Sequence, residues 1–253
     1  MPRFKVGVQI HPQHCTTDQI VDAACRADAL GVETVWVWDH FFPLYGDPEG
    51  PHFECYTLLA AIARETRQAM LGAMVAGNTY RNPELLATMT HTLDHLSGGR
   101  AILGVGAGWN ERDHREYGIE FGDAAWRLRE LGKALPRMKS RLEKSRPGPI
   151  GPVPIMIGGS GEKVTLKLVA RHADMWNGFP PAPSWAHKNE VLDQWCATEG
   201  RDPSEIERTS NITIRQLDEA EALVAAGAQH LILEWPVPFD IDRVEWLLRL
   251  SGR

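Results

Sequence analysis

The chain alternates short apolar runs with longer segments in which apolar residues recur every three or four positions. The first pattern is typical of buried strands and the second of amphipathic helices. The apolar runs predict strands over Phe4–Ile10, Thr34–Trp38, Ala69–Val75, Ala101–Val105, Ile155–Gly158, Met175–Phe179, Ser210–Ile214 and His230–Leu233. The periodic segments predict helices over 17–30, 54–66, 83–96, 124–144, 161–172, 184–199, 217–226 and 241–250.

Residues that favour helix ends lie at several of these boundaries. Thr16 precedes the first predicted helix, Asn82 and Pro83 open the third, and Ser160 opens the fifth. Such side chains accept hydrogen bonds from the first backbone N–H groups of a helix, while proline fits its first turn. Gly31 and Gly227 follow predicted helix ends, where the left-handed conformation is common.

Strict alternation of strands and helices predicts a parallel sheet, and eight such units favour a closed (β/α)8 barrel. An open doubly wound sheet is the alternative. We expect a single domain over residues 1–253, a length that such barrels often reach. The segment Ser145–Pro154, SRPGPIGPVP, is the one break in the pattern, and we interpret it as an ordered loop rather than a linker.

Candidate chemistry follows from the barrel, because active sites of this fold lie at the carboxyl ends of the strands. Asp39 and His40 follow the second predicted strand directly. A histidine there can exchange a proton near neutral pH, and a neighbouring aspartate can orient its ring. The equally weighted alternative is structural, with Asp39 capping a loop and His40 bonded within the fold.

Two glycine clusters also follow strands. Gly104, Gly106 and Gly108 surround the end of the fourth predicted strand, where a missing Cβ lets the backbone approach a ligand. The turn Gly158-Gly159-Ser160-Gly161 leads from the fifth strand into a helix, an arrangement that favours a phosphate group. A turn that requires positive φ is the alternative. Trp109 follows the fourth predicted strand and Trp176 lies in the sixth, and both are predicted to border a planar ligand.

His91 and His95 are spaced one helical turn apart, as in a zinc-binding helix. Thr92 stands where that motif needs its glutamate, and the helix lies outside the predicted barrel. We therefore predict a solvent-facing helix and no metal site.

Composition narrows the classes of partner. The net charge of −6, without basic runs, argues against nucleic acid. Apolar runs are too short to cross a membrane, and no apolar leader segment opens the chain. The four cysteines are scattered and are expected to be reduced thiols of a cytoplasmic protein.

The motifs of serine hydrolases, P-loops and Rossmann dinucleotide sites are absent, so a redox cofactor would supply chemistry that the side chains lack.

Several segments together resemble the luciferase-like monooxygenase superfamily, and within it the branch that uses the deazaflavin coenzyme F420. The matching segments cover nearly the whole chain: GVETVWVWDHF, LGAMVAGNTYRNP, LDHLSGGRAILGVGAGWNERDHREYG, PIMIGGSGEKVTLKLVARHADMWN and WAHKNEVLDQWCATEGRDPSEIERT. The glycine blocks are specific as a set, although neither is specific alone.

The resemblance implies a bacterial-luciferase-like barrel and a place for each candidate residue. Asp39 and His40 would flank the redox ring of the cofactor, with His40 able to supply a proton. The remaining cofactor contacts that it implies are Met74, Val75, Ala76, Gly106, Ala107, Gly108, Trp109, Gly158, Gly159, Ser160, Gly161, Trp176 and Asn177. The Met74–Val75 peptide bond would be cis, and the glycines from 158 to 161 would hold a phosphate.

The implied activity is F420-dependent hydride transfer to or from a small organic substrate, as a dehydrogenase or reductase. An FMN-dependent monooxygenase and a non-catalytic flavin- or deazaflavin-binding protein remain alternatives. Leu44 and Trp109 replace the Trp and Glu of the sugar-phosphate dehydrogenases, which argues against glucose-6-phosphate oxidation. The resemblance also implies a homodimer formed through helices beside the second to fourth strands.

One further departure concerns the region between Arg127 and Pro154, which is shorter than is usual in this family. Family members carry an insertion before the fifth strand that often covers the cofactor. A shortened insertion predicts a site that is more open or is closed by a partner subunit.

Overall fold

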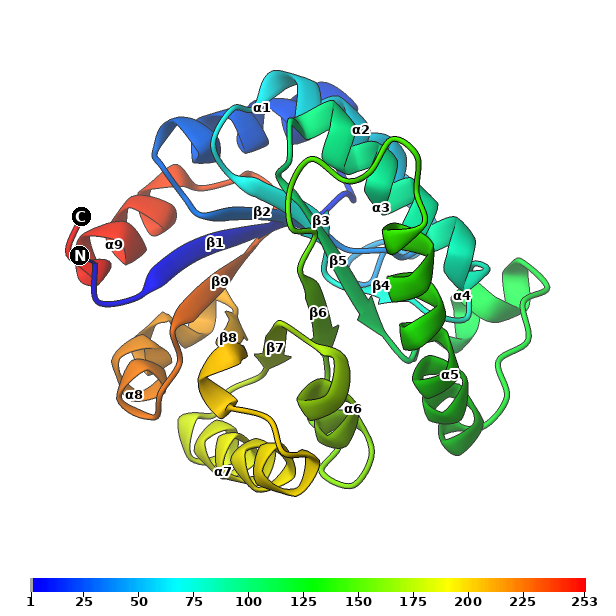
Figure 1. Ribbon diagram of the computed structural model, residues 1–253. Helices are drawn as coiled ribbons and strands as arrows, with labels where there is room; N and C mark the ends of the chain where they lie inside the picture. The colour runs from blue at the N-terminus through cyan, green and yellow to red at the C-terminus, as the bar shows by residue number, and fades with distance from the viewer. Residues whose placement is uncertain (1) are drawn as a thin grey trace.

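The computed structural model describes residues 2–253, in which one parallel sheet closes into a barrel ringed by helices (Figure 1). The strands follow the order β3-β2-β1-β9-β8-β7-β6-β5-β4, and pairing of β3 with β5 closes the ring. Their bounds are β1 Lys5–Ile10, β2 Thr34–Val37, β3 Met70–Ala73, β4 Ala76–Gly77, β5 Ala101–Gly106, β6 Ile155–Gly158, β7 Met175–Gly178, β8 Glu207–Ile212 and β9 His230–Trp235.

The short strand β4 continues β3 along the same stave, so the barrel has eight staves and the predicted (β/α)8 fold is confirmed. The Met74–Val75 peptide bond between the two strands is cis, as the resemblance implied. The helices are α1 Thr17–Ala29, α2 Cys55–Glu65, α3 Pro83–Ser97, α4 Glu111–Glu116, α5 Ala124–Glu143, α6 Thr165–His172, α7 Ala182–Glu199, α8 Ala220–Ala225 and α9 Ile241–Ser251, with 3-10 turns η1 Pro203–Glu205 and η2 Ile214–Glu219.

Two apolar layers hold this arrangement together. A small cluster fills the barrel interior, and the larger one lies between the sheet and its helices. Because the interior is packed, a ligand is confined to the ends of the strands. The interior cluster consists of Trp36, Met74, Ile102, Met156, Met175 and Ile232.

The predicted helix ends agree with the structure at α1 and α3. Thr16 and Gln19 form a capping box at the start of α1. The Asn82 side chain accepts from the Leu85 N–H at the start of α3, whose end is followed by Gly98 in the left-handed conformation.

The predicted bounds differ most from those of the structure in three places. Strand β8 begins at Glu207 rather than Ser210. The apolar pattern missed this start because the first two residues of the strand are charged and are bonded to other side chains. Helix α6 begins at Thr165, so the Gly159–Val164 segment is loop rather than helix. The segment predicted as the helix 217–226 divides into η2 and α8.

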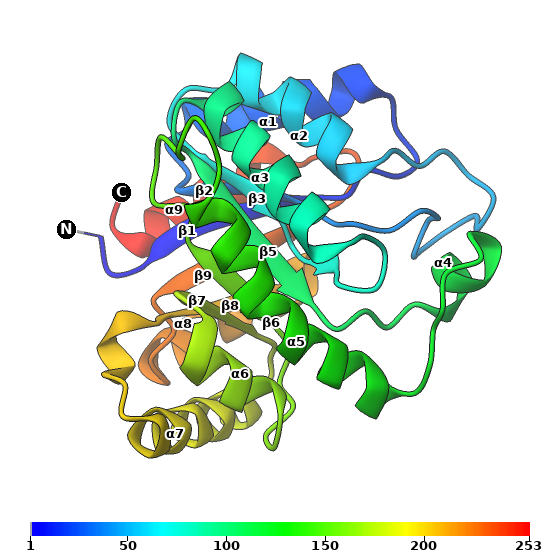
Figure 2. The same cartoon turned by 45° about the vertical axis from the view of Figure 1, so that its right-hand side comes forward.

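The Ser145–Pro154 loop connects the end of α5 to the start of β6, and therefore lies at the amino-terminal end of the barrel. Figure 2 shows this loop on the side of the chain termini, away from α4. Asp94 accepts from the N–H groups of Ile150 and Gly151, which fixes the loop against α3. This loop itself lies at the opposite end of the strands from the predicted cofactor site, and the expectation of a site that is more open or is closed by a partner subunit stays a prediction.

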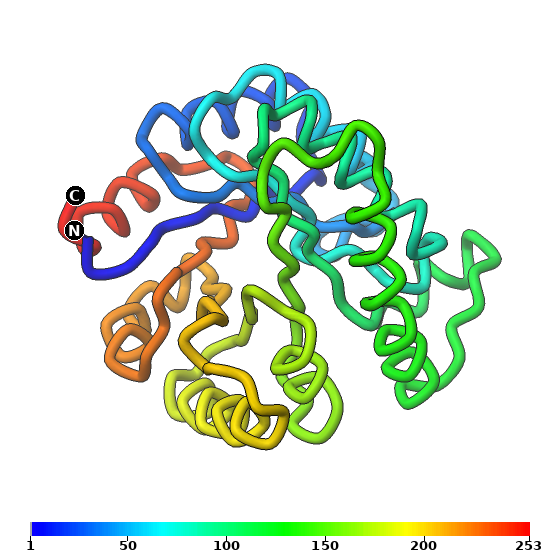
Figure 3. The backbone as a smooth tube through the Cα atoms, in the orientation of Figure 1, coloured from blue at the N-terminus to red at the C-terminus, as the bar shows by residue number. Residues whose placement is uncertain are grey.

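The two ends of the chain lie side by side, as the backbone trace shows (Figure 3). The Arg3 N–H donates to the Ser251 carbonyl at 2.7 Å. Among residues 2–253, no helix is both long enough and apolar enough to span a membrane.

Candidate active site

A cavity of about 360 Å³ lies at the carboxyl ends of the strands and collects most of the predicted site residues. Its lining includes Asp39, His40, Met74, Val75, Ala76, Gly106, Ala107, Gly108, Trp109, Gly158, Gly159 and Asn177. The other lining residues are Leu44, which sequence analysis named only as a departure from the sugar-phosphate dehydrogenases, and Gln9, Trp38, Tyr45, Gly77, Tyr80, Thr165, Phe179, Asn211 and Glu234.

Val75 forms the centre of one wall, between the glycine ends of β5 and β6. A Cβ added to Gly106 would lie 2.8 Å from Val75 Cγ2, and one added to Gly158 would lie 3.0 Å from Val75 Cγ1. The absence of side chains at these two positions therefore makes room for Val75. The result is an apolar surface flanked by bare backbone, which suits one face of a planar ring system.

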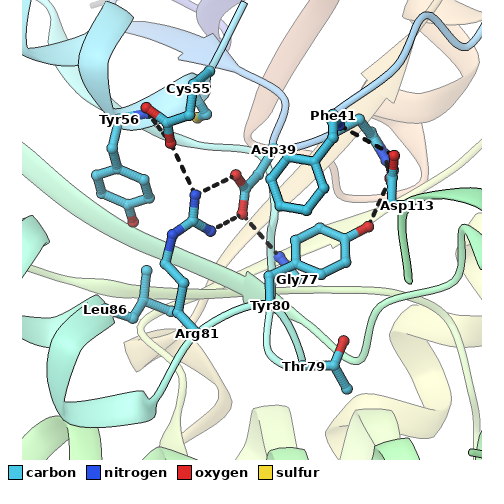
Figure 4. A network of polar contacts seen from close by, with 12 residues as sticks. Asp39, Phe41, Cys55, Tyr56, Gly77, Thr79, Tyr80, Arg81, Leu86 and Asp113 are labelled. Carbon is cyan, nitrogen blue, oxygen red and sulfur yellow. Dashed lines mark hydrogen bonds and ion pairs between the residues drawn. The ribbon is translucent and has the colours of Figure 1, made fainter. Parts of the chain in front are cut away.

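Asp39 is buried in an ion pair with Arg81 (Figure 4). The guanidinium donates to both carboxylate oxygens, at 2.5 and 2.9 Å, and also to Glu54 at 2.9 Å. Burial raises the pKa of Asp39, against the opposing effect of Arg81. Burial alone would lower the pKa of Arg81, but the bonds to Asp39 hold it above its ordinary value. The prediction that Asp39 orients His40 is therefore wrong.

His40 is oriented by Asp113 instead. The Nδ1–H of His40 donates to Asp113 Oδ2 at 2.6 Å, and the Tyr80 hydroxyl donates to the same oxygen at 2.8 Å. The Phe41 N–H donates to the other oxygen at 3.1 Å, and Figure 4 shows the bonds from Tyr80 and Phe41 converging on Asp113. With Nδ1 bonded, Nε2 is the nitrogen left to exchange a proton with a ligand.

The Asp113 carboxylate is stabilised in its ionised form. Burial would raise its pKa, but hydrogen bonds from His40 and Tyr80 hold that pKa below its ordinary value. The sequence offered one signal for this residue, namely an acidic side chain shortly after the glycine cluster. The charged segment ERDHRE that carries it forms α4, a helix that was not predicted.

Trp109 covers part of the cavity from its rim. Its side chain remains largely exposed, and its ring meets that of His40 edge-on at 5.4 Å between centroids. Trp176 behaves differently, because it is fully buried and does not line the cavity. Its indole N–H donates to the Gly159 carbonyl at 2.8 Å. The prediction that Trp176 borders a planar ligand is thus corrected: it supports the glycine turn from behind.

The glycine turn after β6 contributes Gly158 and Gly159 to the lining, whereas Ser160 and Gly161 lie outside it. Thr165, the first residue of α6, takes their place. No side chain caps this helix. Unpaired N–H groups at a helix start attract anions, so the Gly159–Thr165 end of the cavity fits a phosphate group.

Polar side chains line the opposite end of the cavity, where β1, β8 and β9 finish. Gln9 Nε2 donates to the Met74 carbonyl at 2.5 Å, and Asn211 Nδ2 donates to Gln9 at 3.2 Å and to Glu234 at 3.0 Å. Burial raises the pKa of Glu234 above its ordinary value. Asn177 is held from behind by the Thr209 hydroxyl at 2.9 Å.

His91 and His95 contact the Ser145–Pro154 loop. Their Nε2 atoms donate to the carbonyls of Pro147 and Gly148, at 2.9 and 3.0 Å, and so the two half-buried rings bind the Ser145–Pro154 loop. Within residues 2–253, no group of three or more potential ligands is arranged to hold a metal ion.

Comparisons with known proteins agree with this geometry. An uncharacterised protein of Mycobacterium tuberculosis is 28% identical over 209 residues, which cover 71% of this chain and 74% of that protein. The F420-dependent glucose-6-phosphate dehydrogenase of Amycolatopsis mediterranei is 32% identical over 190 residues, which cover 68% of this chain and 56% of that enzyme.

Solved structures show the same fold. An F420-dependent secondary alcohol dehydrogenase in complex with an F420–acetone adduct superposes with a TM-score of 0.86 at 17% identity, covering 98% of both chains. The F420-dependent tetrahydromethanopterin reductase of Methanopyrus kandleri gives 0.78 at 15% identity, covering 99% of this chain and 97% of that one. The model of the family described as luciferase-like monooxygenase matches residues 3–249, and the chain belongs to this family.

Proposed function

We propose that this protein is an F420-dependent oxidoreductase that moves a hydride between the deazaflavin and a small organic substrate. One observation carries the proposal: a single cavity combines an apolar wall at Val75, an anion-binding helix start at Thr165 and a histidine held by Asp113. The names of several relatives and structural neighbours, which are F420-dependent dehydrogenases and reductases, support it.

The residues present fit this cofactor. The bare backbone at Gly106 and Gly158 leaves the Val75 wall accessible to a flat ring, and the α6 start fits the phosphate of the cofactor's side chain. When bound, the deazaflavin supplies a ring carbon that accepts or releases the hydride. Trp109 and Tyr45 border the cavity and would exclude water from the reacting atoms. His40 Nε2 would give a proton to the substrate oxygen or nitrogen, or take one from it.

The substrate differs from glucose 6-phosphate. Leu44 and Trp109, which replace the Trp and Glu of the sugar-phosphate dehydrogenases, both line the cavity. Among the described residues, no lysine or arginine contributes to this lining. A second phosphate, on the substrate, would therefore find no cationic partner there.

A titration with F420 and, separately, with FMN tests the choice of cofactor through quenching of tryptophan fluorescence. We expect F420 to bind at least about tenfold more tightly than FMN, a difference of about 1.4 kcal/mol. Trp109→Phe should remove much of the quenching with little change in affinity. Preference for FMN would favour the oxygen-using alternative, and retention of F420 without turnover on any substrate would favour a binding protein.

We also propose a homodimer formed through α2 and α3, whose outer faces include the half-exposed Leu85. Light scattering of the purified protein measures its mass in solution. A monomer at micromolar concentration would contradict this part of the proposal.

A further inference from the structure

The end of the cavity farthest from the α6 start contains a carboxylate without a cationic partner. Glu234 lines the cavity at the end of β9, and only about a fifth of its side chain is exposed. Its nearest basic group is His11, whose Nε2 lies 3.8 Å from Glu234 Oε2. Burial lowers the pKa of His11 to about 3, so this ring is neutral at physiological pH. Within residues 2–253, no lysine or arginine forms an ion pair with Glu234.

The His11 ring beside this carboxylate belongs to a group of packed aromatic rings. His11 stacks on Trp38 at 4.1 Å between ring centroids, and Tyr45 lies 6.2 Å from both rings. Burial and the negative charge of Glu234 raise the pKa of the Tyr45 hydroxyl. Trp38 and Tyr45 both line the cavity. A ligand beside Glu234 would therefore also contact these two aromatic side chains.

A carboxylate removed from water is unstable unless a cation or hydrogen-bond donors compensate for the lost hydration. Among residues 2–253, a single donor, Asn211 Nδ2, bonds to the Glu234 carboxylate. Aromatic faces attract cations and are the usual partners of organic ammonium groups in proteins. An ammonium group in this position would also favour the ionised form of Glu234.

We propose that Glu234, Trp38 and Tyr45 bind a positively charged nitrogen on the substrate, so that the enzyme acts on small organic amines. The inference rests on the proposed function, because it assigns this end of the cavity to the substrate and the Val75 wall to the cofactor. Asn211 is a positioning residue that holds the Glu234 carboxylate, and it makes no contact of its own with the ligand in this scheme.

Calorimetric titration with three probes of similar shape tests the proposal: benzylammonium, benzyl alcohol and benzoate. The protein is titrated both alone and after saturation with F420. Benzylammonium should bind at least about tenfold more tightly than benzyl alcohol, and benzoate should bind more weakly than either. Equal affinity for the first two probes, or no measurable binding of benzylammonium, would overturn the proposal.

Glu234→Gln keeps the acceptor for Asn211 and removes the charge. We expect it to weaken benzylammonium binding by at least about tenfold and to leave benzyl alcohol binding unchanged. Glu111→Gln is the matched control, because Glu111 is exposed at the same end of the barrel and does not line the cavity. If Glu234→Gln left the preference for benzylammonium intact, the assignment of Glu234 would be wrong.

Tyr45→Leu provides a second test that does not depend on the folding of the Glu234 variant. Tyr45 lies on an exposed loop, and its loss should weaken benzylammonium binding about threefold or more without affecting benzyl alcohol. F420 binding is measured separately on each variant. If the wild-type protein bound F420 but showed no preference for the ammonium probe, only this inference would be wrong. If the wild-type protein did not bind F420, the proposed function itself would be wrong.

Discussion

The sequence alone predicted the wrong hydrogen-bond partner for His40, because it favoured the adjacent residue. Asp39 is the next residue along the chain, but its carboxylate faces Arg81. Asp113, which is 73 positions away, bonds His40 instead. Consecutive side chains of an extended segment point in opposite directions, so neighbours in a D-H pair are poorly placed to contact each other. The residue types at the site were predictable, whereas their pairing required the fold.

Asp113→Asn should destabilise the protein by about 1.5–3 kcal/mol, the usual range for hydrogen bonds to a buried charged group. The amide keeps the shape of the side chain but cannot accept from His40, Tyr80 and Phe41 as the carboxylate does. Urea unfolding at neutral pH measures the change. Glu120→Gln, at an exposed position just beyond α4, should have almost no effect. Equal stability of the two variants would show that the hydrogen bonds to Asp113 do not contribute measurably to the free energy of unfolding.

At the scale of the elements, the carboxyl ends of β5 and β6 are shaped around Val75. Gly106→Ala places a methyl group 2.8 Å from Val75 Cγ2 and should cost about 1–3 kcal/mol of stability. Val75→Ala in the same chain removes the clash, so the double variant should be more stable than the sum of the single changes predicts by about 1 kcal/mol.

Unfolding of all four members of this cycle gives the coupling directly. Gly148→Ala is the control, because nothing lies within 4 Å of a Cβ added there. Additive effects of the Gly106 and Val75 changes would contradict the role assigned to these glycines.

The starts of β1, β8 and β9 are joined by a charged group that should make stability depend on pH. Burial would raise the pKa of Glu207, but hydrogen bonds from His230 and Lys5 lower it to about 2. Because the folded-state pKa lies below the unfolded value of about 4.5, this stabilisation is present above that value and is lost as the pH falls toward 2.

The full difference corresponds to about 3 kcal/mol. Unfolding free energies of the wild type and of Glu207→Gln between pH 7 and pH 2 measure it. The variant should show a weaker decline with acidification. Parallel curves for the two proteins would mean that other carboxylates govern the acid sensitivity.

The pattern of apolar residues was sufficient to predict strands in which nearly all side chains are buried and apolar, such as β1 and β5. The same pattern did not predict strand residues whose polar side chains are buried and hydrogen-bonded to other side chains. The start of β8 was missed because Arg208 is bonded to Asn189 and Asp193, which no local pattern reveals. Helix α4 was missed because it is short and almost entirely charged. The cavity residues Asn211 and Glu234 were also not predicted. Each is a polar residue near the end of a buried strand, and the apolar pattern does not indicate that its side chain lines a cavity.

At the scale of the whole molecule, ligand binding is expected at only one of the two ends of the barrel. The amino-terminal end contains the Ser145–Pro154 loop, and the carboxyl end contains the cavity. Cleavage at a protease site engineered after Gly148 should therefore leave F420 affinity within about twofold of that of the intact chain. Cleavage after Gly46 should weaken ligand binding by about tenfold or more, because Leu44 and Tyr45 line the cavity.

Fluorescence titration of each nicked protein, with its uncut form as the control, distinguishes the two ends. A loss of affinity after cleavage at Gly148 would show that the amino-terminal loop influences the cofactor site after all.

The bonds that converge on Asp113 also bear on how the substrate specificity of such an enzyme can be engineered. His40 and Phe41 follow β2, Tyr80 follows β4, and Asp113 lies in α4 after β5, so one carboxylate joins three loops. Arg112 extends the link by donating to the Pro48 carbonyl at 2.7 Å. A graft of any one loop from a relative would leave buried donors or a buried carboxylate without partners. A new specificity engineered here is therefore best sought by exchanging all three loops together.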